Sequence, residues 1–298
     1  MIGLILALLA GLSYAFSNNI IRKGMSYSGE SYSPLPINIS IGTLFFAVVL
    51  VISGNIDELI SISWLGIGAL TVAGAIHFII GRFFIFTGIR LIGTNKTVPI
   101  TSSSILIAVL IGVFFLGEPL TASLGIAVLL IVGGVALIST SGESNAVMPV
   151  IPKGSLATGI LAALVGALCW GLSPVLMKIG LREVSTPLVA LFLAYISAFT
   201  IISFSLFRSI NRQRLRNLNR NALVSIVIAG LIGSIGATML RMTALAYSPV
   251  SVVEPLAGSA QNLFIFPVSY LINRRIESFN SKIIIGAIAI VIGIFLIF

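Results

Sequence analysis

Long apolar stretches alternate with short polar ones along almost the whole chain. A helix needs roughly 20 apolar residues, each rising about 1.5 Å, to cross a bilayer. We predict such a helix in ten stretches: 2–21, 35–52, 64–90, 97–116, 120–138, 156–179, 187–207, 222–247, 250–272 and 283–298. A polar stretch at 139–155, which contains two prolines, separates the first five helices from the last five. The pattern therefore predicts an all-α integral protein of the cell membrane with ten transmembrane helices.

The second half of the chain repeats the first at a constant shift of 156 residues, which takes residue 3 to residue 159. The segment GLILALLAGLSYAFSNNIIRKGM begins at Gly3, and GILAALVGALCWGLSPVLMKIGL begins at Gly159. The same shift relates these pairs: Tyr14 and Trp170, Ser17 and Ser173, Gly74 and Gly230, Thr87 and Thr243, Pro99 and Pro255, Ser103 and Ser259. Because each half has an odd number of helices, the second half enters the membrane from the opposite side. We therefore predict two five-helix repeats of inverted topology, over 1–140 and 156–298, joined by a linker over 141–155.

Composition agrees with a membrane protein. Apolar residues make up 58% of the 298 positions and charged residues only 8%, whereas ordinary soluble domains have roughly 25% charged residues. The net charge of +9 does not indicate nucleic acid here, because the basic residues lie between apolar runs, where they set orientation and contact anionic lipid. With one cysteine, Cys169, and one histidine, His77, no disulfide or Cys/His metal cluster can form within one chain. We expect no cofactor and no metal.

The basic residues predict the orientation. If both chain ends face outside, only Lys178 and Arg182 lie in the outer loops. The inner loops then hold Arg22, Lys23, Arg90, Lys96, Lys153, Arg208, Arg212, Arg214, Arg216, Arg220, Arg274, Arg275 and Lys282. Since loops on the cytoplasmic side are enriched in lysine and arginine, the sequence predicts that both ends lie outside.

Two charged residues lie at matching depth in the eighth and ninth predicted helices. Arg241 comes eight residues before Pro249, and Glu254 comes five residues after it. Both therefore lie roughly 8–12 Å from the turn between the helices, and we predict that they pair. The pair is either a structural link between the helices or a coupling site. In the second case Glu254 takes up and releases a proton as substrate moves, with Arg241 tuning its affinity for the proton.

The third predicted helix carries Arg82 and His77. Arg82 lies nearer the opposite end of the membrane, and its guanidinium can either bind a substrate carboxylate through two hydrogen bonds or extend to the membrane surface. His77 is either a hydrogen-bonded interior residue or part of a proton relay.

Pro99 and Pro255 occupy equivalent places in the fourth and ninth predicted helices, and small or hydroxyl residues follow each of them. A proline inside a helix frees a carbonyl and bends the helix, and small residues let neighbouring helices approach. Broken or bent helices at matched positions of an inverted repeat indicate a binding site. Residues on the same helices and on the first helix of each half complete the candidate site: Ser102, Ser259, Gln261, Asn262, Tyr14, Ser17, Asn18, Trp170 and Ser173. For the two aromatic residues, ordinary core packing or an interface belt is the alternative.

Three features of the sequence carry a family resemblance. They are the paired opening helices, with GLSYAFSNNIIRKG and ALCWGLSPVLMKIG, the turn FFLGEPLT with Gly117, Glu118, Leu120 and Thr121 before a glycine-rich helix, and ALAYSPVSVVEPL leading into Pro267. In these features the chain resembles the drug/metabolite transporter superfamily, in its ten-helix EamA-type branch. In the second half the shift becomes 159, so that Glu277 aligns with Glu118 and Gly293 with Gly134. The resemblance implies transport of small organic solutes, often export of amino acids or related metabolites, commonly driven by protons. Members of this branch are often described with cytoplasmic chain ends, whereas the loop charges here predict the reverse.

The inverted repeat therefore predicts a secondary transporter that moves a small organic metabolite by alternating access. The resemblance implies that the metabolite is an amino acid or a related solute, that the direction is export and that protons drive it. No Walker lysine motif is present, so ATP is not expected to drive it directly. The alternatives are an uncoupled facilitator with a structural Glu254–Arg241 pair and a lipid-directed membrane protein. One histidine, one cysteine and one intramembrane carboxylate make a poor catalytic set, and we expect no catalytic residue. The expected partners are the substrate, lipids and protons, and the transporter is expected to act as a monomer or homodimer.

Overall fold

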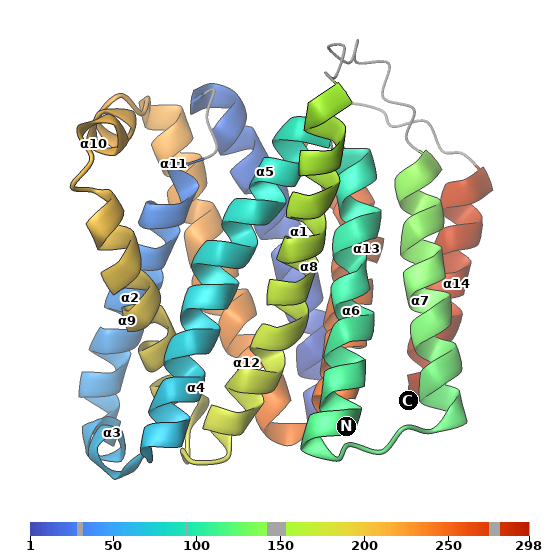
Figure 1. Ribbon diagram of the computed structural model, residues 1–298, viewed down its shortest axis with the longest axis horizontal. Coiled ribbons are helices and arrows are strands. Elements are labelled where there is room, and N and C mark those ends of the chain that lie inside the picture. The colour runs from blue at the N-terminus through green and yellow to red at the C-terminus, as the bar shows by residue number, and fades with distance from the viewer. Residues whose placement is uncertain (29–31, 93, 142–152, 274–280, 298) are drawn as a thin grey trace.

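The computed structural model describes residues 1–28, 32–92, 94–141, 153–273 and 281–297, and all regular elements in these ranges are helices (Figure 1). Eight long helices are uninterrupted: α1 (Ile2–Ser28), α2 (Pro34–Ser53), α6 (Thr94–Leu116), α7 (Ala122–Ser141), α8 (Lys153–Leu181), α9 (Pro187–Ser205), α13 (Val250–Asn273) and α14 (Ser281–Ile297). Two further rods each contain a π-helical segment. They are α4 (Trp64–Gly74), η2 (Ala75–Gly81) and α5 (Arg82–Ile92), and α11 (Arg220–Ala229), η3 (Gly230–Ala237) and α12 (Thr238–Tyr247).

Each of the ten predicted helices coincides with one of these helices or rods. The largest difference is at α1, which continues through seven mostly polar residues beyond the predicted end at residue 21. Three short helices lie in segments that we predicted as loops: η1 (Asn55–Asp57), α3 (Glu58–Ser61) and α10 (Ser209–Arg216). At α10, the Asn211 amide donates to the Ser205 carbonyl at 2.8 Å and so satisfies the end of α9.

Several of the helices are long and apolar enough to cross a membrane. Among the described residues six satisfy both criteria: Ile2–Met25, Pro34–Ser53, Trp64–Ile85, Leu156–Leu181, Pro187–Ser205 and Arg220–Tyr247. Three apolar helices are shorter, namely Ile100–Leu116, Ala122–Ile138 and Ile284–Ile297. Length and composition therefore support an integral membrane protein, while the count of ten spanning helices stays a prediction.

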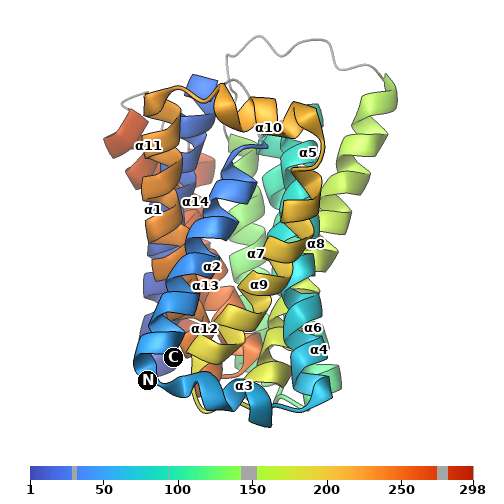
Figure 2. The same cartoon turned by 90° about the vertical axis from the view of Figure 1, so that its left-hand side faces the viewer.

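The two chain ends and α3 lie at one end of the bundle, and the arginine-rich helix α10 lies at the other (Figures 1 and 2). Helix α1 starts at the end that holds the chain termini, whereas α8 starts at the opposite end (Figure 1). Equivalent helices of the two halves thus run in opposite directions, as the predicted inverted repeat requires.

The halves pack crosswise. Helix α1 lies against α11, η3 and α12 of the second half, and α8 lies against α4, η2 and α5 of the first half. The same contacts occur twice: a Cβ atom added at Gly3 would lie 2.2 Å from Ser248 Oγ, and one at Gly159 would lie 2.4 Å from Ile92 Cγ2. The shift of 156 residues relates both members of these two pairs. Each half therefore depends on the other for its packing.

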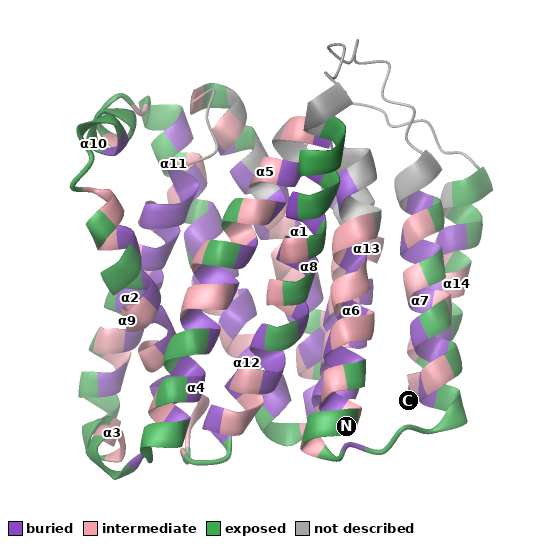
Figure 3. Ribbon diagram, in the orientation of Figure 1, coloured by how far each residue is buried: buried purple, intermediate pink, exposed green. Residues whose placement is uncertain are grey.

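Helices α7 and α14 pack on each other at one edge of the bundle (Figure 1). A Cβ atom at Gly134 would lie 2.8 Å from Ile290 Cγ1, and one at Gly293 would lie 2.8 Å from Ile131 Cγ1. The shift of 159 residues relates these contacts, which confirms the alignment of Gly134 with Gly293. Along both helices buried and exposed residues alternate (Figure 3), and large apolar side chains such as Phe295 are exposed. An exposed apolar face of this kind suits lipid.

The main core includes three aromatic rings from α2, η2 and α9 that pack at tilted angles. Phe46, Phe78 and Tyr195 are fully buried, and the ring of Tyr195 lies 5.2 Å from that of Phe46 and 4.3 Å from that of Phe78. This cluster fixes η2 beside the interface between the halves, where the polar residues gather.

Candidate functional site

The two π-helical segments occupy equivalent positions in the third rod of each half. Adding 156 to 75–81 gives 231–237, and η3 spans Gly230–Ala237. Carbonyls in and beside these segments accept hydrogen bonds from side chains: Ser17 donates to Ala229 at 2.8 Å, Tyr195 to Ser234 at 2.7 Å, and Trp170 to His77 at 3.4 Å. Because π-helical segments disturb the regular backbone ladder and often lie at functional sites, they mark this part of the interface as a candidate site.

At Pro99 and Pro255, where we expected broken or bent helices, the structure shows no break, and a bend stays a prediction. Helices α6 and α13 run without interruption through both prolines. Each proline is the sixth residue of its helix, so it removes one hydrogen bond near the start and leaves the following turns intact. The matched irregularities lie one rod earlier, in η2 and η3. The side chain of Pro99 lies outside the described residues.

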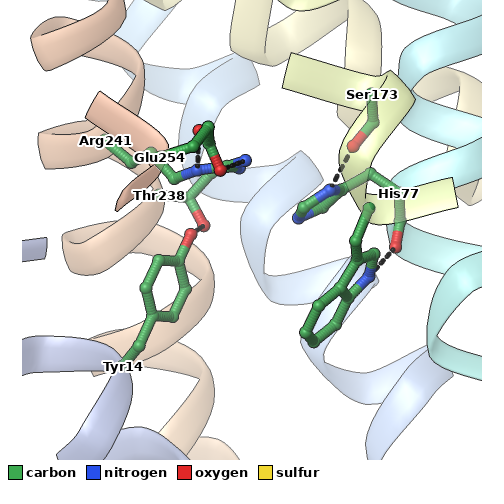
Figure 4. A network of polar contacts seen from close by, with 7 residues as sticks. Tyr14, His77, Ser173, Thr238, Arg241 and Glu254 are labelled. Carbon is green, nitrogen blue, oxygen red and sulfur yellow. Dashed lines mark hydrogen bonds and ion pairs between the residues drawn. The ribbon is translucent and has the colours of Figure 1, made fainter. Parts of the chain in front are cut away.

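Arg241 and Glu254 form the predicted pair. Arg241 Nε donates to Glu254 Oε1 at 2.9 Å, and Nη2 donates to Oε2 at 2.8 Å (Figure 4). The side chains are only 7% and 12% exposed. Both carboxylate oxygens are therefore held by one guanidinium in a two-bond geometry, which is among the strongest pairings available to these groups.

Tyr14 joins the first half to this pair. Its hydroxyl lies 3.1 Å from Thr238 Oγ1, and Thr238 Oγ1 donates to the Gly233 carbonyl at 2.9 Å. Since the hydroxyl hydrogen of Thr238 goes to Gly233, Tyr14 acts as the donor to Thr238. The phenol of Tyr14 also interacts electrostatically with Arg241, so the tyrosine lies beside the ion pair (Figure 4).

His77, from the first half, makes a second contact with the second half. Its Nδ1 atom lies 2.7 Å from Ser173 Oγ (Figure 4), and its ring stacks on the indole of Trp170 at 5.8 Å. The equivalent serine, Ser17, lies against Gly233, which stands at the position of His77. The histidine therefore makes the two halves chemically different at a point where their backbones correspond.

Arg82 is directed toward the same region. Its guanidinium carbon lies 5.5 Å from the centre of the Phe78 ring, one turn toward the start of the rod. The end of the rod nearer to Arg82 is at Ile92, and the guanidinium points away from that end. This direction does not fit a side chain that extends to the nearer membrane surface. The charges of Arg82 and Arg241 both act on His77. We call Tyr14, His77, Arg82, Arg241 and Glu254 the central polar cluster.

The remaining candidates divide into two groups. Ser17 and Ser102 are buried, and Asn18 and Gln261 are half-buried. Ser259 and Asn262 bond to their own helix, through the carbonyls of Leu256 at 2.9 Å and Gly258 at 2.8 Å. The small residues of α13 allow close packing as expected, because a Cβ atom at Gly11 would lie 2.3 Å from the Ala257 carbonyl.

Sequence reasoning missed Thr238 and Tyr195. The shift of 156 residues aligns Thr238 with Arg82. The repeat could therefore have identified Thr238 as a site residue, because Arg82 was already a candidate. Tyr195 lies in an apolar helix, where nothing distinguishes it from an ordinary core aromatic residue.

A turn next to the cluster is held by two charged residues. Glu118 accepts hydrogen bonds from the backbone N–H groups of Val250 at 2.7 Å and Ser251 at 2.8 Å, at the start of α13. Lys178 donates to the carbonyls of Leu245 and Ser248, at the end of α12. The sequence motif around Glu118 thus fixes the helices that carry Arg241 and Glu254.

Known proteins agree with this architecture. The sequence profile of the EamA-like transporter family matches residues 1–140 and 157–298. One crystal structure has a TM-score of 0.73 at 18% sequence identity, over 97% of this chain and 95% of the other, a likeness of fold. A comparison with curated protein sequences found no match. Because the profile matches both halves, the chain belongs to the EamA-like transporter family, whose members are membrane transporters of the drug/metabolite superfamily.

Proposed function

We propose that the protein is a secondary transporter that carries a small organic metabolite across the cell membrane by alternating access between its halves. The observation that carries the proposal is that the polar contacts of the central region cross from one half to the other. Tyr14 bonds to Thr238, and His77 bonds to Ser173. In inverted-repeat transporters the substrate lies near the midplane, where the repeats meet.

Ten spanning helices suit this mechanism, because two halves of five give opposite orientations to equivalent helices. The substrate class is an amino acid or a related metabolite, and export is the favoured direction, as for many family members. The central polar cluster contains guanidinium, imidazole and phenol groups, and the indole of Trp170 borders it. These groups can bind both the polar and the apolar part of a small solute. The proposed transporter neither hydrolyses ATP nor catalyses a reaction.

Glu254 is the proposed coupling group. Arg241 holds both of its oxygens, and we expect at least one of these bonds to open when a proton binds to the carboxylate. Protonation of Glu254 would thereby free Arg241, and the return of Arg241 would expel the proton. This exchange would link proton movement to a change in the site.

A second candidate function is uncoupled facilitation with a purely structural Arg241–Glu254 pair. The observation in its favour is the two-bond geometry of the pair. The Glu254 carboxylate accepts two charged hydrogen bonds from Arg241, at 2.8 and 2.9 Å, and this pairing is strong without any further partner. The coupling role and the structural role of the pair predict opposite results for Glu254→Gln, which keeps the shape of the side chain but loses its charge.

The test uses purified protein in proteoliposomes and a pool of labelled amino acids and other small metabolites, with and without a proton gradient. We expect gradient-dependent accumulation by the wild type, and Glu254→Gln should retain exchange but lose accumulation. Arg212→Gln on the exposed helix α10 is the control and should behave as wild type. Equilibration that ignores the gradient would favour the facilitator, and a complete absence of movement would contradict transport.

A further inference from the structure

The interior of the bundle has an excess of positive charge. Of the eight acidic residues in the chain, only Glu254 belongs to a predicted spanning helix. The others lie outside the predicted spanning helices: Glu30, Asp57, Glu58, Glu118, Glu143, Glu183 and Glu277. Arg82 and Arg241, by contrast, both lie well inside spanning rods. Among the described residues, the inner parts of the spanning rods therefore contain two guanidinium groups and one carboxylate, apart from the buried Glu118 at the turn between α12 and α13.

Glu254 cannot neutralise both arginines. Its two oxygens are bonded to Arg241 Nε and Nη2. Arg82 contacts the face of Phe78, and within the described part of the chain it has no carboxylate partner. A charge in the membrane interior is costly unless an opposite charge or water compensates it. Among the residues that the structure describes, Arg82 therefore has no counter-ion.

The neighbours of Arg82 do not supply the missing negative charge. Its charge acts on His77 and Tyr195, and both are buried. The imidazole of His77 bonds to Ser173 Oγ, and the hydroxyl of Tyr195 donates to the Ser234 carbonyl. The guanidinium donors of Arg82 remain for a ligand that enters the cluster.

We propose that the transported substrate is an organic monocarboxylate with a net negative charge, and that Arg82 binds its carboxylate. The inference rests on the proposed transport function and narrows its substrate class from amino acids and related metabolites to related acids that carry no ammonium group. One unneutralised guanidinium matches one negative charge, and its planar fork fits a carboxylate. The stacked rings of Trp170 and His77 offer an aromatic surface to the organic part.

The same charge balance disfavours two other classes. A zwitterionic amino acid adds an ammonium group, and the carboxylate that would bind it, Glu254, is already bonded through both oxygens. A phosphate monoester carries about −1.5 to −2 charges at pH 7, so part of its charge would stay uncompensated. An amide with the same shape as the carboxylate is uncharged, so it would leave the charge of Arg82 uncompensated as well.

The experiment measures uptake of size-matched labelled probes into proteoliposomes. One set contains lactate, lactamide, alanine and glycerol phosphate, and a second set contains phenyllactate, its amide and phenylalanine. We expect a carboxylate to move at least several-fold faster than its amide and its amino analogue, and to raise the melting temperature of the detergent-solubilised protein. Arg82→Gln should abolish both effects, Arg82→Lys should retain the preference for carboxylates, and Arg212→Gln should change nothing.

The outcomes distinguish a failure of the carboxylate inference from a failure of the proposed transport function. Faster movement of amino acids or amides than of carboxylates overturns the inference while transport stands. So does undiminished carboxylate uptake by Arg82→Gln. If no probe and no solute of the broader pool moves, the proposed transport function fails and the inference fails with it. Should Arg82→Gln fail to fold, the selectivity of the wild type and of Arg82→Lys still decides the question.

Discussion

Glu118 and Lys178 bind the two helix ends that meet at the turn between α12 and α13. The carboxylate of Glu118 receives the first N–H groups of α13, and the ammonium group of Lys178 donates to the last carbonyls of α12. Each charge has the sign that the adjacent helix dipole favours. The residues come from different halves, so the turn is also a contact between the repeats.

We predict that Glu118→Gln destabilises the protein by about 1–3 kcal/mol, because a glutamine offers one acceptor oxygen to two buried N–H groups. Thermal unfolding in detergent measures the loss. Asp57→Asn is the control, since Asp57 is exposed and such surface changes usually remain within about 0.5 kcal/mol. Equal melting temperatures for Glu118→Gln and the wild type would show that the two hydrogen bonds contribute little.

A double-mutant cycle separates the two roles of the Arg241–Glu254 pair. Removing one partner leaves the other charge buried and unpaired, which costs about 3–5 kcal/mol, whereas replacing both by apolar residues is often close to neutral. We therefore expect Arg241→Met and Glu254→Met to be less stable singly than together. If the double variant is stable and still accumulates substrate against a gradient, the pair is structural and Glu254 is not the coupling group.

The equivalent serines Ser17 and Ser173 provide a matched pair of variants. Ser173 bonds to the ring of His77, while Ser17 bonds to a backbone carbonyl. Each substitution by alanine removes one interhelical hydrogen bond, which in membranes contributes about 0.6 kcal/mol on average, so similar losses of stability are expected. Only Ser173→Ala should also slow transport several-fold, because it releases the His77 ring. Equal transport rates for both variants would contradict a role for the orientation of His77.

Elements that depend on length, depth or repetition could be predicted from the sequence. The start of α13 after Pro249 and the pairing of Arg241 with Glu254 followed from residue spacing alone. The π-helical segments could not be predicted, because nothing in the composition of AIHFIIG and GLIGSIGA distinguishes a π-helical turn from an α-helical one. At Pro99 and Pro255 no break occurs, because a sequence shows where a hydrogen bond is lost but not whether the neighbouring turns continue.

Orientation can be tested on the two ends that the fold separates. Helix α10 lies at the end opposite the chain termini (Figures 1 and 2), and the arginines of this region predict that it faces the cytoplasm. In a Cys169→Ser background, a membrane-impermeant thiol reagent applied to intact cells should label Asp57→Cys and not Gln213→Cys, both of which are exposed positions. Permeabilised cells are the control, because both variants must then react. Labelling of Gln213→Cys alone in intact cells would place the termini inside. Replacing the arginines at 208, 212, 214, 216 and 220 by glutamine should weaken or invert the wild-type pattern, because these side chains supply five of the thirteen basic residues on the predicted inner side.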